Sequence, residues 1–312
     1  MNSQHPPRVA FIGLGNMGWP MCHNLVSKSL WPEQSALVVF NRTRQRCEGL
    51  QAQLPPASVV IAESIRGVLD SADIIFTCLS DGQAVREVVE AALASRQAAG
   101  KLFVECSTIH PRETADLAAD VRQAGACFVA CPVFGAPDRA HSGQLVCVPA
   151  GTRADVQRVL PYCRGVMGRA VIDLTGRAPE TATTLKVLGN SFIFNMAEAV
   201  AEGHVLAEKT GLGGALLHEY LSLFFPGIYE AYSQRMLSGD YHKRDEPAFA
   251  ASLARKDIRH ALDLSSTCGA RLPALEVVDG HLAAVERLKH EKGDYVGIYG
   301  ILRQHAGLTY EN

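Results

Sequence analysis

The sequence predicts an α/β protein in which a doubly wound parallel sheet is followed by an all-helical domain. Short β-rich runs alternate with helix-like segments up to about residue 174, which is typical of a largely parallel sheet covered on both faces. After Gly176 only long helical periods follow, and 312 residues exceed the usual length of one domain. We therefore expect one domain at residues 1–177 and a second at residues 178–312.

The elements of the first domain are predicted from local pattern. Short apolar runs predict strands at residues 9–12, 37–40, 59–61, 74–78, 102–105, 128–130, 145–148 and 171–174. The runs between them predict helices near residues 17–28, 44–52, 64–70, 82–94, 112–124 and 153–163.

The second domain is expected to contain helices only. Helical periods occur at residues 179–209, 213–237, 248–267, 274–289 and 294–305. Pro179 suits a first helical turn and Gly211 suits a position beyond a helix end, so the first period is predicted to be one helix of about 30 residues that links the two domains. Residues 241–247 are expected to form a polar linker.

Composition excludes several classes of partner. Hydrophobic residues make up 47% and charged residues 20% of the chain, and the net charge is -2, so no global field recruits nucleic acid or an acidic membrane. No apolar run approaches the roughly 20 residues that span a bilayer, and the N-terminus lacks a signal-peptide core. The nine cysteines include no Cys-x-x-Cys pair. We expect a cytoplasmic protein whose partners are small molecules or other subunits.

A glycine-rich turn joins the first predicted strand to the first helix. It reads Gly13-Leu14-Gly15-Asn16-Met17-Gly18. Gly13 permits a tight turn, Gly15 lets the backbone approach a pyrophosphate, and Gly18 lets the helix pack closely on the sheet. In this strand–turn–helix context the motif predicts the dinucleotide site of a Rossmann-type domain.

The end of the second strand favours NADP over NAD as the cofactor. An NAD site usually carries Asp or Glu there, whereas this chain reads Asn41-Arg42-Thr43-Arg44. A guanidinium can donate two parallel hydrogen bonds to a 2′-phosphate. The alternative is that both arginines are only the solvated first turn of a helix. The strand end lies farther from Gly13 than usual, which indicates an insertion near residues 30–36.

Five motifs occur in order along almost the whole chain. They are residues 11–21, Asn41-Arg42-Thr43, Ser107-Thr108 within residues 105–111, Lys186 with Asn190, and Lys256-Asp257. This series resembles the β-hydroxyacid dehydrogenase family, which includes 3-hydroxyisobutyrate dehydrogenase and glyoxylate/succinic semialdehyde reductase and belongs to the 6-phosphogluconate dehydrogenase-like superfamily.

The resemblance implies roles for individual residues. Lys186 and Asn190 match the catalytic pair, and Thr108 matches a threonine near the nicotinamide. Leu79 and Ser80 fall on the cofactor side, and Lys256 is expected to lie over the cofactor or over a substrate carboxylate. Ser107 and the loop with Phe134, Gly135 and Ala136 fall on the substrate side. A homodimer or homotetramer is expected.

Three departures from the family concern the substrate more than the fold. Phe134 puts a phenyl ring where the family's loop usually has a serine, which removes a hydrogen-bond donor for a carboxylate and makes the pocket more apolar. Ser80 replaces a usual proline, and Gly189 replaces an asparagine. Gly189 either makes room for close approach of the backbone or the substrate, or is a sequence change without functional effect.

Lys186 raises the question of a buried cation. No further charge follows it until Glu198, and Asn190 lies one helical turn away on the same face. The alternative is a surface lysine whose ammonium bends to water. For Lys256 the alternative is an exposed helix face.

A catalytic lysine suits hydride chemistry. Hydride transfer to a carbonyl builds negative charge on its oxygen, which a protonated lysine stabilises and protonates, and Asn190 can bind the same oxygen. This chemistry needs no metal, and the 11 histidines show no ligand-like spacing.

We therefore expect an NADP(H)-dependent enzyme that interconverts a carbonyl and an alcohol. Two alternatives stay open: an imine reductase, which shares the architecture but typically has Asp or Tyr at the position of Lys186, and a non-catalytic NADPH-binding protein.

Overall fold

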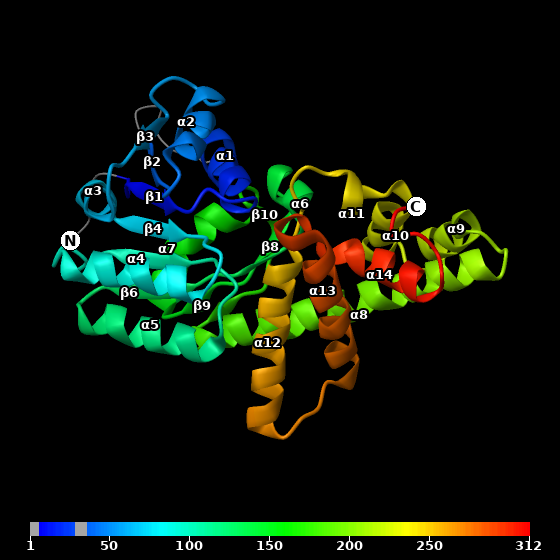
Figure 1. Ribbon diagram of the computed structural model, residues 1–312. Helices are drawn as coiled ribbons and strands as arrows, with labels where there is room; N and C mark the ends of the chain where they lie inside the picture. The colour runs from blue at the N-terminus through cyan, green and yellow to red at the C-terminus, as the bar shows by residue number, and fades with distance from the viewer. Residues whose placement is uncertain (1–5, 29–35) are drawn as a thin grey trace. The chain divides into compact units, whose positions relative to one another are not determined.

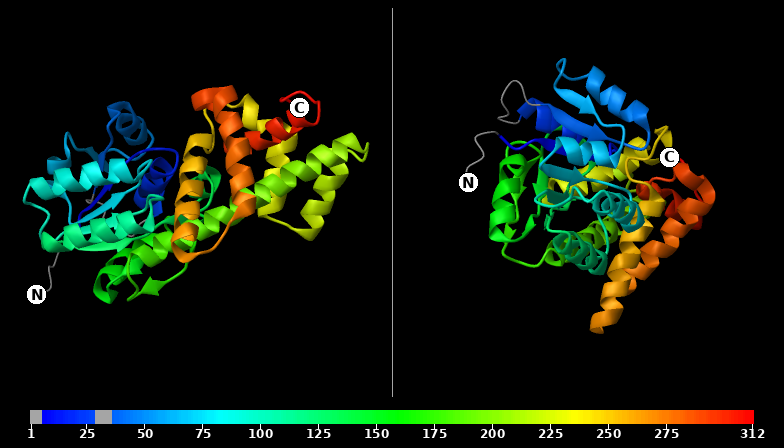
Figure 2. Two further views of the ribbon diagram at one scale, coloured as in Figure 1. Left: turned by 60° about the horizontal axis from the view of Figure 1, so that its bottom comes forward. Right: turned by 90° about the vertical axis from the view of Figure 1, so that its left-hand side faces the viewer.

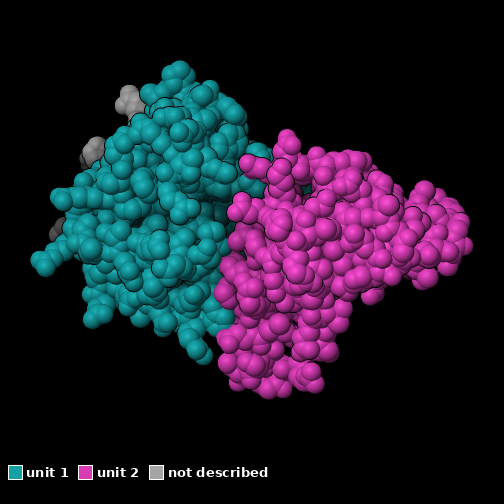
Figure 3. Space-filling view, in the orientation of Figure 1, with its two compact units in different colours: residues 1–186 teal, residues 187–312 magenta. Residues whose placement is uncertain are grey.

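The computed structural model describes residues 6–28 and 36–312. The chain divides into two compact units, Met1–Lys186 and Val187–Asn312, which Figure 3 colours separately. The division falls inside the 30-residue helix α8 (Glu180–Lys209), whereas the predicted domain boundary lies just before that helix. Except for Ala36, the proposed insertion at residues 30–36 lies outside the described residues.

The main sheet of the first unit has eight strands. They are β1 (Val9–Ile12), β2 (Leu37–Phe40), β3 (Val59–Ile61), β4 (Ile74–Thr77), β5 (Leu102–Glu105), β6 (Cys127–Ala130), β9 (Ala150–Gly151) and β11 (Leu174–Thr175). Their order is β3-β2-β1-β4-β5-β6-β9-β11, and all neighbours are parallel except β6 and β9. The first six strands follow the doubly wound order 3-2-1-4-5-6, which confirms the predicted fold class.

Helices cover both faces of this sheet (Figures 1 and 2). They are α1 (Gly18–Lys28), α2 (Arg44–Ala52), α3 (Ile65–Ser71), α4 (Gly82–Ala94), α5 (Pro111–Gln123), α6 (Pro137–His141) and α7 (Arg153–Cys163). Successive side chains of a strand point to opposite faces. Phe11 accordingly packs in one hydrophobic core with Met21 of α1, whereas Ile12 packs in a second core with Val89 of α4.

A second sheet corrects two expectations. Strands β10 (Gly168–Val171), β8 (Leu145–Cys147) and β7 (Val133–Phe134) form a separate three-stranded sheet, so the run at residues 145–148 does not extend the main sheet. The expected strand at residues 171–174 is also wrong, because β10 and β11 lie in different sheets. Asp173 separates them, since its Oδ1 accepts the Thr175 amide hydrogen at 2.8 Å and makes a local turn.

The second unit is helical, as predicted. Its helices after α8 are α9 (Gly214–Phe224), α10 (Ile228–Ser238), α11 (Asp240–Lys243), α12 (Ala251–Cys268), α13 (Pro273–Lys289) and α14 (Ile298–His305), with 3-10 turns at His290–Lys292 and Tyr295–Gly297. The single helix expected at residues 213–237 is wrong, because Pro226 lacks an amide hydrogen and Gly227 has φ of 96°. The expected linker at residues 241–247 begins as the end of α11.

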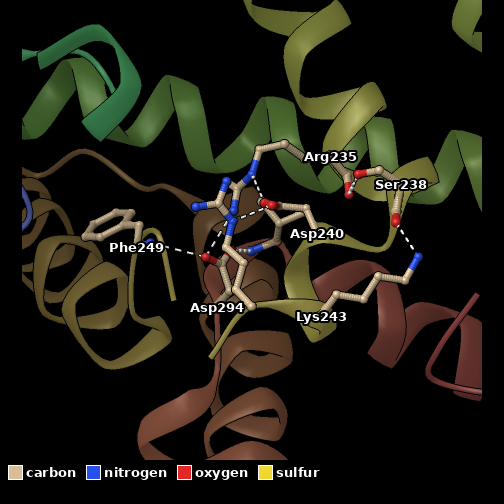
Figure 4. Close-up of polar contacts among 8 residues, drawn as sticks. Arg235, Ser238, Asp240, Lys243, Phe249 and Asp294 are labelled. Carbon is tan, nitrogen blue, oxygen red and sulfur yellow. Dashed lines mark hydrogen bonds and ion pairs between the residues drawn. The ribbon is translucent and has the colours of Figure 1, made fainter. Parts of the chain in front are cut away.

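Charged side chains fix the short helix α11 beside its neighbours (Figure 4). Arg235 of α10 donates to Asp240 at 2.7 Å and to Asp294 at 3.0 Å. Asp294 also accepts the Phe249 amide hydrogen at 3.1 Å, so a buried carboxylate joins three segments. Among the described residues, no helix is long and apolar enough to cross a membrane.

Candidate functional site

The glycine-rich turn has the geometry of a pyrophosphate site. Gly13 has φ of 100°, and a Cβ on it would lie 2.3 Å from the Cys78 oxygen. A Cβ on Gly18 would lie 1.9 Å from the Gly13 oxygen, so the start of α1 can pack here only as glycine. A Cβ on Gly15 would meet nothing within 4 Å, which leaves open space beside the helix N-terminus. The three glycines therefore fit a dinucleotide, with Gly15 facing the space that the pyrophosphate needs.

Two side chains after β2 hold this turn in place. Asn41 Oδ1 accepts the amide hydrogen of the buried Leu14 at 2.9 Å, and its Nδ2 donates to the Thr43 oxygen at 2.9 Å. Arg46 of α2 donates to the Leu14 oxygen at 3.1 Å. Asn41 therefore braces the backbone of the turn, while Asn16 and the half-buried Met17 complete it.

A cavity of about 460 Å³ lies beside the ends of β2 and β3. Its walls combine apolar side chains with the charged residues Arg42, Arg44, Glu63 and Glu87. Arg44 is paired with Glu63 at 2.6 Å and with Glu48 at 2.9 Å. An apolar cavity with charged groups at the end of β2 is suited to the adenosine half of a dinucleotide.

The loops after β4 and β5 are joined to each other. Ser107 Oγ accepts the Leu79 amide hydrogen at 2.7 Å. The buried Glu105 accepts the Ser107 amide hydrogen at 2.6 Å through Oε1, and its Oε2 binds the hydroxyl of Thr77. These residues stand at the carboxyl ends of neighbouring parallel strands, where open α/β sheets bind their ligands.

The remaining residues of these two loops are more accessible. Ser80 is exposed and donates to Asp81 at 2.7 Å, where Asp81 caps α4. Thr108 is half-buried just before α5. Both follow strands of the main sheet at its carboxyl edge, where open α/β sheets bind their ligands.

Four buried cysteines support the loop that carries Phe134. Cys106, Cys131, Cys147 and Cys163 form a thiol cluster. Hydrogen bonds from the other three thiols lower the pKa of Cys131. The bond between Cys106 and Cys131 raises the pKa of Cys106. Among the described residues, no group of three or more His, Cys, Asp and Glu side chains could hold a metal ion.

Lys186 meets Phe134 directly. Its Nζ lies 4.7 Å from the centroid of the Phe134 ring, which is a cation–π contact, and the residue is only 8% exposed. This burial contradicts the alternative of a surface lysine. Phe134 is fixed in β7, and the following Gly135 has φ of 139° before the exposed Ala136.

Asn190 and Lys256 share Asp257 as a partner, a residue that belongs to the Lys256-Asp257 motif but to which the sequence alone assigns no role. Asn190 Nδ2 donates to Asp257 Oδ2 at 2.7 Å, and Lys256 Nζ lies 3.2 Å from Asp257 Oδ1. Asp257 is 3% exposed. The Lys256 side chain is 15% exposed, so the alternative of a solvated helix face is wrong. α8 runs without a break through the half-buried Gly189 between Lys186 and Asn190.

Two family models match almost the entire chain. The NAD binding domain of 6-phosphogluconate dehydrogenase matches residues 8–176. The NAD-binding domain of NADP-dependent 3-hydroxyisobutyrate dehydrogenase matches residues 181–302.

Individual proteins are similar over the same length. The NADH-dependent oxidoreductase ucdB of Aspergillus ustus is 32% identical over 94% of this chain and 98% of its own length. The 3-sulfolactaldehyde reductase of Escherichia coli is 28% identical over 96% of this chain and 97% of its own. The solved structure of Mycobacterium tuberculosis 3-hydroxyisobutyrate dehydrogenase with L-serine has a TM-score of 0.79 at 24% identity and covers 96% of this chain and 100% of its own, which supports the same fold.

Proposed function

The chain belongs to the β-hydroxyacid dehydrogenase family and is an NAD(P)-dependent oxidoreductase acting on CH–OH groups, and from this premise we propose that it is an NADP(H)-dependent enzyme in which Lys186 is the catalytic acid and base. Its substrate is a carbonyl or alcohol with an apolar group near Phe134. The buried ammonium of Lys186 over the Phe134 ring is the observation that carries this proposal.

The chemistry follows from charge development on the substrate oxygen. The bound nicotinamide cofactor supplies or accepts the hydride. As the carbonyl carbon is reduced, its oxygen becomes negative, and the Lys186 ammonium stabilises it and donates a proton. In the reverse direction neutral Lys186 accepts the alcohol proton. The low solvent exposure of Lys186 strengthens its interaction with the substrate oxygen in both directions, because little water screens the charges.

Asn190 and Asp257 support this step as a fixed pair. The Asn190 amide is held by Asp257, so its orientation is set before a substrate binds. We assign Asn190 to the substrate oxygen and Lys256, paired with the same carboxylate, to the cofactor. Preorganised polar groups of this kind lower the barrier because they need not reorient during the reaction.

The substrate loop favours an apolar substituent over a carboxylate. Phe134 offers no hydrogen-bond donor, and its ring packs with the core that also holds Leu79 and Leu185. A carboxylate placed there would lose hydration without gaining a donor from this side chain. Ser107, Gly135 and Ala136 complete the proposed substrate contacts.

NADP is the proposed cofactor because Arg42 and Arg44 line the cavity at the end of β2 and no carboxylate occupies position 41. A 2′-phosphate can bind both guanidinium groups. The relative named as NADH-dependent makes the comparison of both nucleotides essential.

The decisive experiment is the substitution Lys186→Ala with a panel of aldehydes, ketones, alcohols and one cyclic imine, followed by NADPH and NADH absorbance. We expect the unaltered enzyme to reduce an apolar carbonyl best and the variant to lose about 10²–10⁴-fold in turnover while it still binds NADPH. Unchanged turnover in the variant would refute the role of Lys186. A preference for the imine would favour an imine reductase.

A second copy of the chain is the proposed macromolecular partner, as a homodimer or homotetramer. Large apolar side chains of α9 are exposed, including Leu216 at 56%, Leu223 at 77% and Phe224 at 70%. Such a surface is typical of a subunit interface. Light scattering during size-exclusion chromatography tests this directly, and a monomer would contradict it. All nine cysteines are free thiols, which suits the expected cytoplasmic location.

A further inference from the structure

Glu63 lines the cavity in which the proposed function places the adenosine ribose. It follows β3 and lines the cavity beside the end of β2 together with Arg42 and Arg44. Both of its carboxylate oxygens lie 2.6 Å from Arg44 Nη1. The guanidinium that a 2′-phosphate would bind is therefore already occupied by a carboxylate.

Arg44 has a second partner that provides a matched comparison. Its Nε donates to Glu48 at 2.9 Å, one turn along α2. Glu48 and Glu63 carry the same charge on the same guanidinium, but only Glu63 lines the cavity. An effect of Glu63 on a nucleotide can thus be separated from a general effect of charge around Arg44.

The two nucleotides make opposite demands on this cluster. A 2′-phosphate carries up to two negative charges, so it is repelled by Glu63 and must displace it from Arg44. A ribose 2′-hydroxyl is a hydrogen-bond donor, and Glu63 can accept from it while its bond to Arg44 stays intact. In NAD sites a carboxylate accepts a hydrogen bond from the ribose hydroxyl, and this carboxylate usually lies at the end of the second strand.

Exposure decides how strong this competition is. The side chains of Arg44 and Glu63 are 52% and 76% exposed, and exposed ion pairs are weak and screened by salt. The pair can therefore open for a phosphate. Arg42 forms no hydrogen bond or ion pair with another described residue, so it can bind the phosphate without first losing a partner.

We propose that Glu63 determines cofactor specificity by holding Arg44 in an arrangement that serves a ribose hydroxyl, which NADPH must break and NADH need not. The inference rests on the proposed function in that it places the adenosine ribose in this cavity. It predicts only a moderate difference in affinity between NADPH and NADH, because one carboxylate after β3 opposes the effect of two arginines after β2.

The test is fluorescence titration of the full chain with NADPH and NADH, using Glu63→Gln and the control Glu48→Gln. Glutamine keeps the size of the side chain and removes its charge. For Glu63→Gln we expect NADPH to bind about fivefold more tightly at low salt, with a smaller gain at high salt, and NADH to bind no more tightly. Glu48→Gln should leave the ratio of the two dissociation constants within about twofold of the unaltered protein.

A double-mutant cycle tests the route through Arg44. In an Arg44→Ala background the gain from Glu63→Gln should largely disappear. A gain that persists there, an equal change for both nucleotides, or an equal change in Glu48→Gln would overturn the inference. If the unaltered chain binds neither nucleotide, the proposed function itself fails, whereas binding of both with no effect of Glu63→Gln refutes only the role of Glu63.

Discussion

Replacing Asn41 with alanine should weaken the binding of both nicotinamide cofactors. Asn41 holds the glycine-rich turn through its bond to the Leu14 amide and holds its own segment through Thr43. The turn is the proposed binding site of the pyrophosphate that NADPH and NADH share. A loss of turn geometry must therefore affect both nucleotides alike.

The size of the effect follows from the lost hydrogen bond. Leu14 is fully buried, so without Asn41 the free turn is expected to shift until its amide hydrogen finds another acceptor, and binding must then restore the original geometry at a cost of up to about 1–3 kcal/mol. That range corresponds to roughly 5- to 150-fold in a dissociation constant. Arg46 still holds the Leu14 oxygen, so the turn does not lose all support, and we expect a loss of about 5- to 20-fold.

The assay is fluorescence titration of Asn41→Ala with each nucleotide, beside the control Arg42→Ala. Arg42 does not brace the turn, so its loss should weaken NADPH and leave NADH within about twofold. The reasoning would be refuted if Asn41→Ala left both dissociation constants unchanged or weakened NADPH alone.

Two further predictions concern the second unit. Asp257→Ala should lower both turnover and the thermal unfolding midpoint, because it removes the carboxylate that accepts the Asn190 Nδ2 hydrogen bond, and a hydrogen bond to a charged group contributes about 1–3 kcal/mol. Asp257→Asn should restore most of the stability, and an unchanged midpoint in the alanine variant would contradict this. Burial, followed by the charge of His218, lowers the pKa of His204 from 6.5 to about 4. As pH falls, the unfolded chain therefore protonates His204 before the folded chain does. Neutral His204 imposes no penalty on folding above pH 6.5, and the free energy of unfolding decreases as pH falls from 6.5 toward 4, by about 3 kcal/mol in total. The unfolding midpoint of His204→Gln should consequently depend less on pH between 6.5 and 4, and parallel curves for the variant and the unaltered protein would argue against it.

Most of the fold could be predicted because local pattern and chain order agree. The apolar runs at β1 to β5 are each followed by a helix-like segment, and this alternation suffices for a parallel sheet. The two-residue strands β7 and β9 could not be found, since so short a run has no period of its own. The break between α9 and α10 does have a local signal, because Pro226-Gly227 is a dipeptide typical of turns.

The roles that the sequence does not reveal depend on contacts between distant segments. Asp257 reaches Asn190 across 67 positions, and Thr77 reaches Glu105 across 28. The hydrophobic periodicity of a short segment carries no information about such a pairing. A signal was nevertheless present in Glu105, because a carboxylate that ends an apolar strand must be bonded if it is buried. For Arg46 no signal was available, since a cation on the first turns of a helix is usually solvated.

The link between the loops after β4 and β5 limits how this enzyme can be redesigned. Ser107 faces the proposed substrate side but also holds the Leu79 backbone, and Glu105 ties Ser107 to Thr77. The two loops consequently shift as one body, and a substitution meant to reshape the substrate pocket at Ser107 would disturb the cofactor side as well. Libraries that vary Ser107 together with Leu79 would be expected to yield more active variants than libraries that vary either position alone.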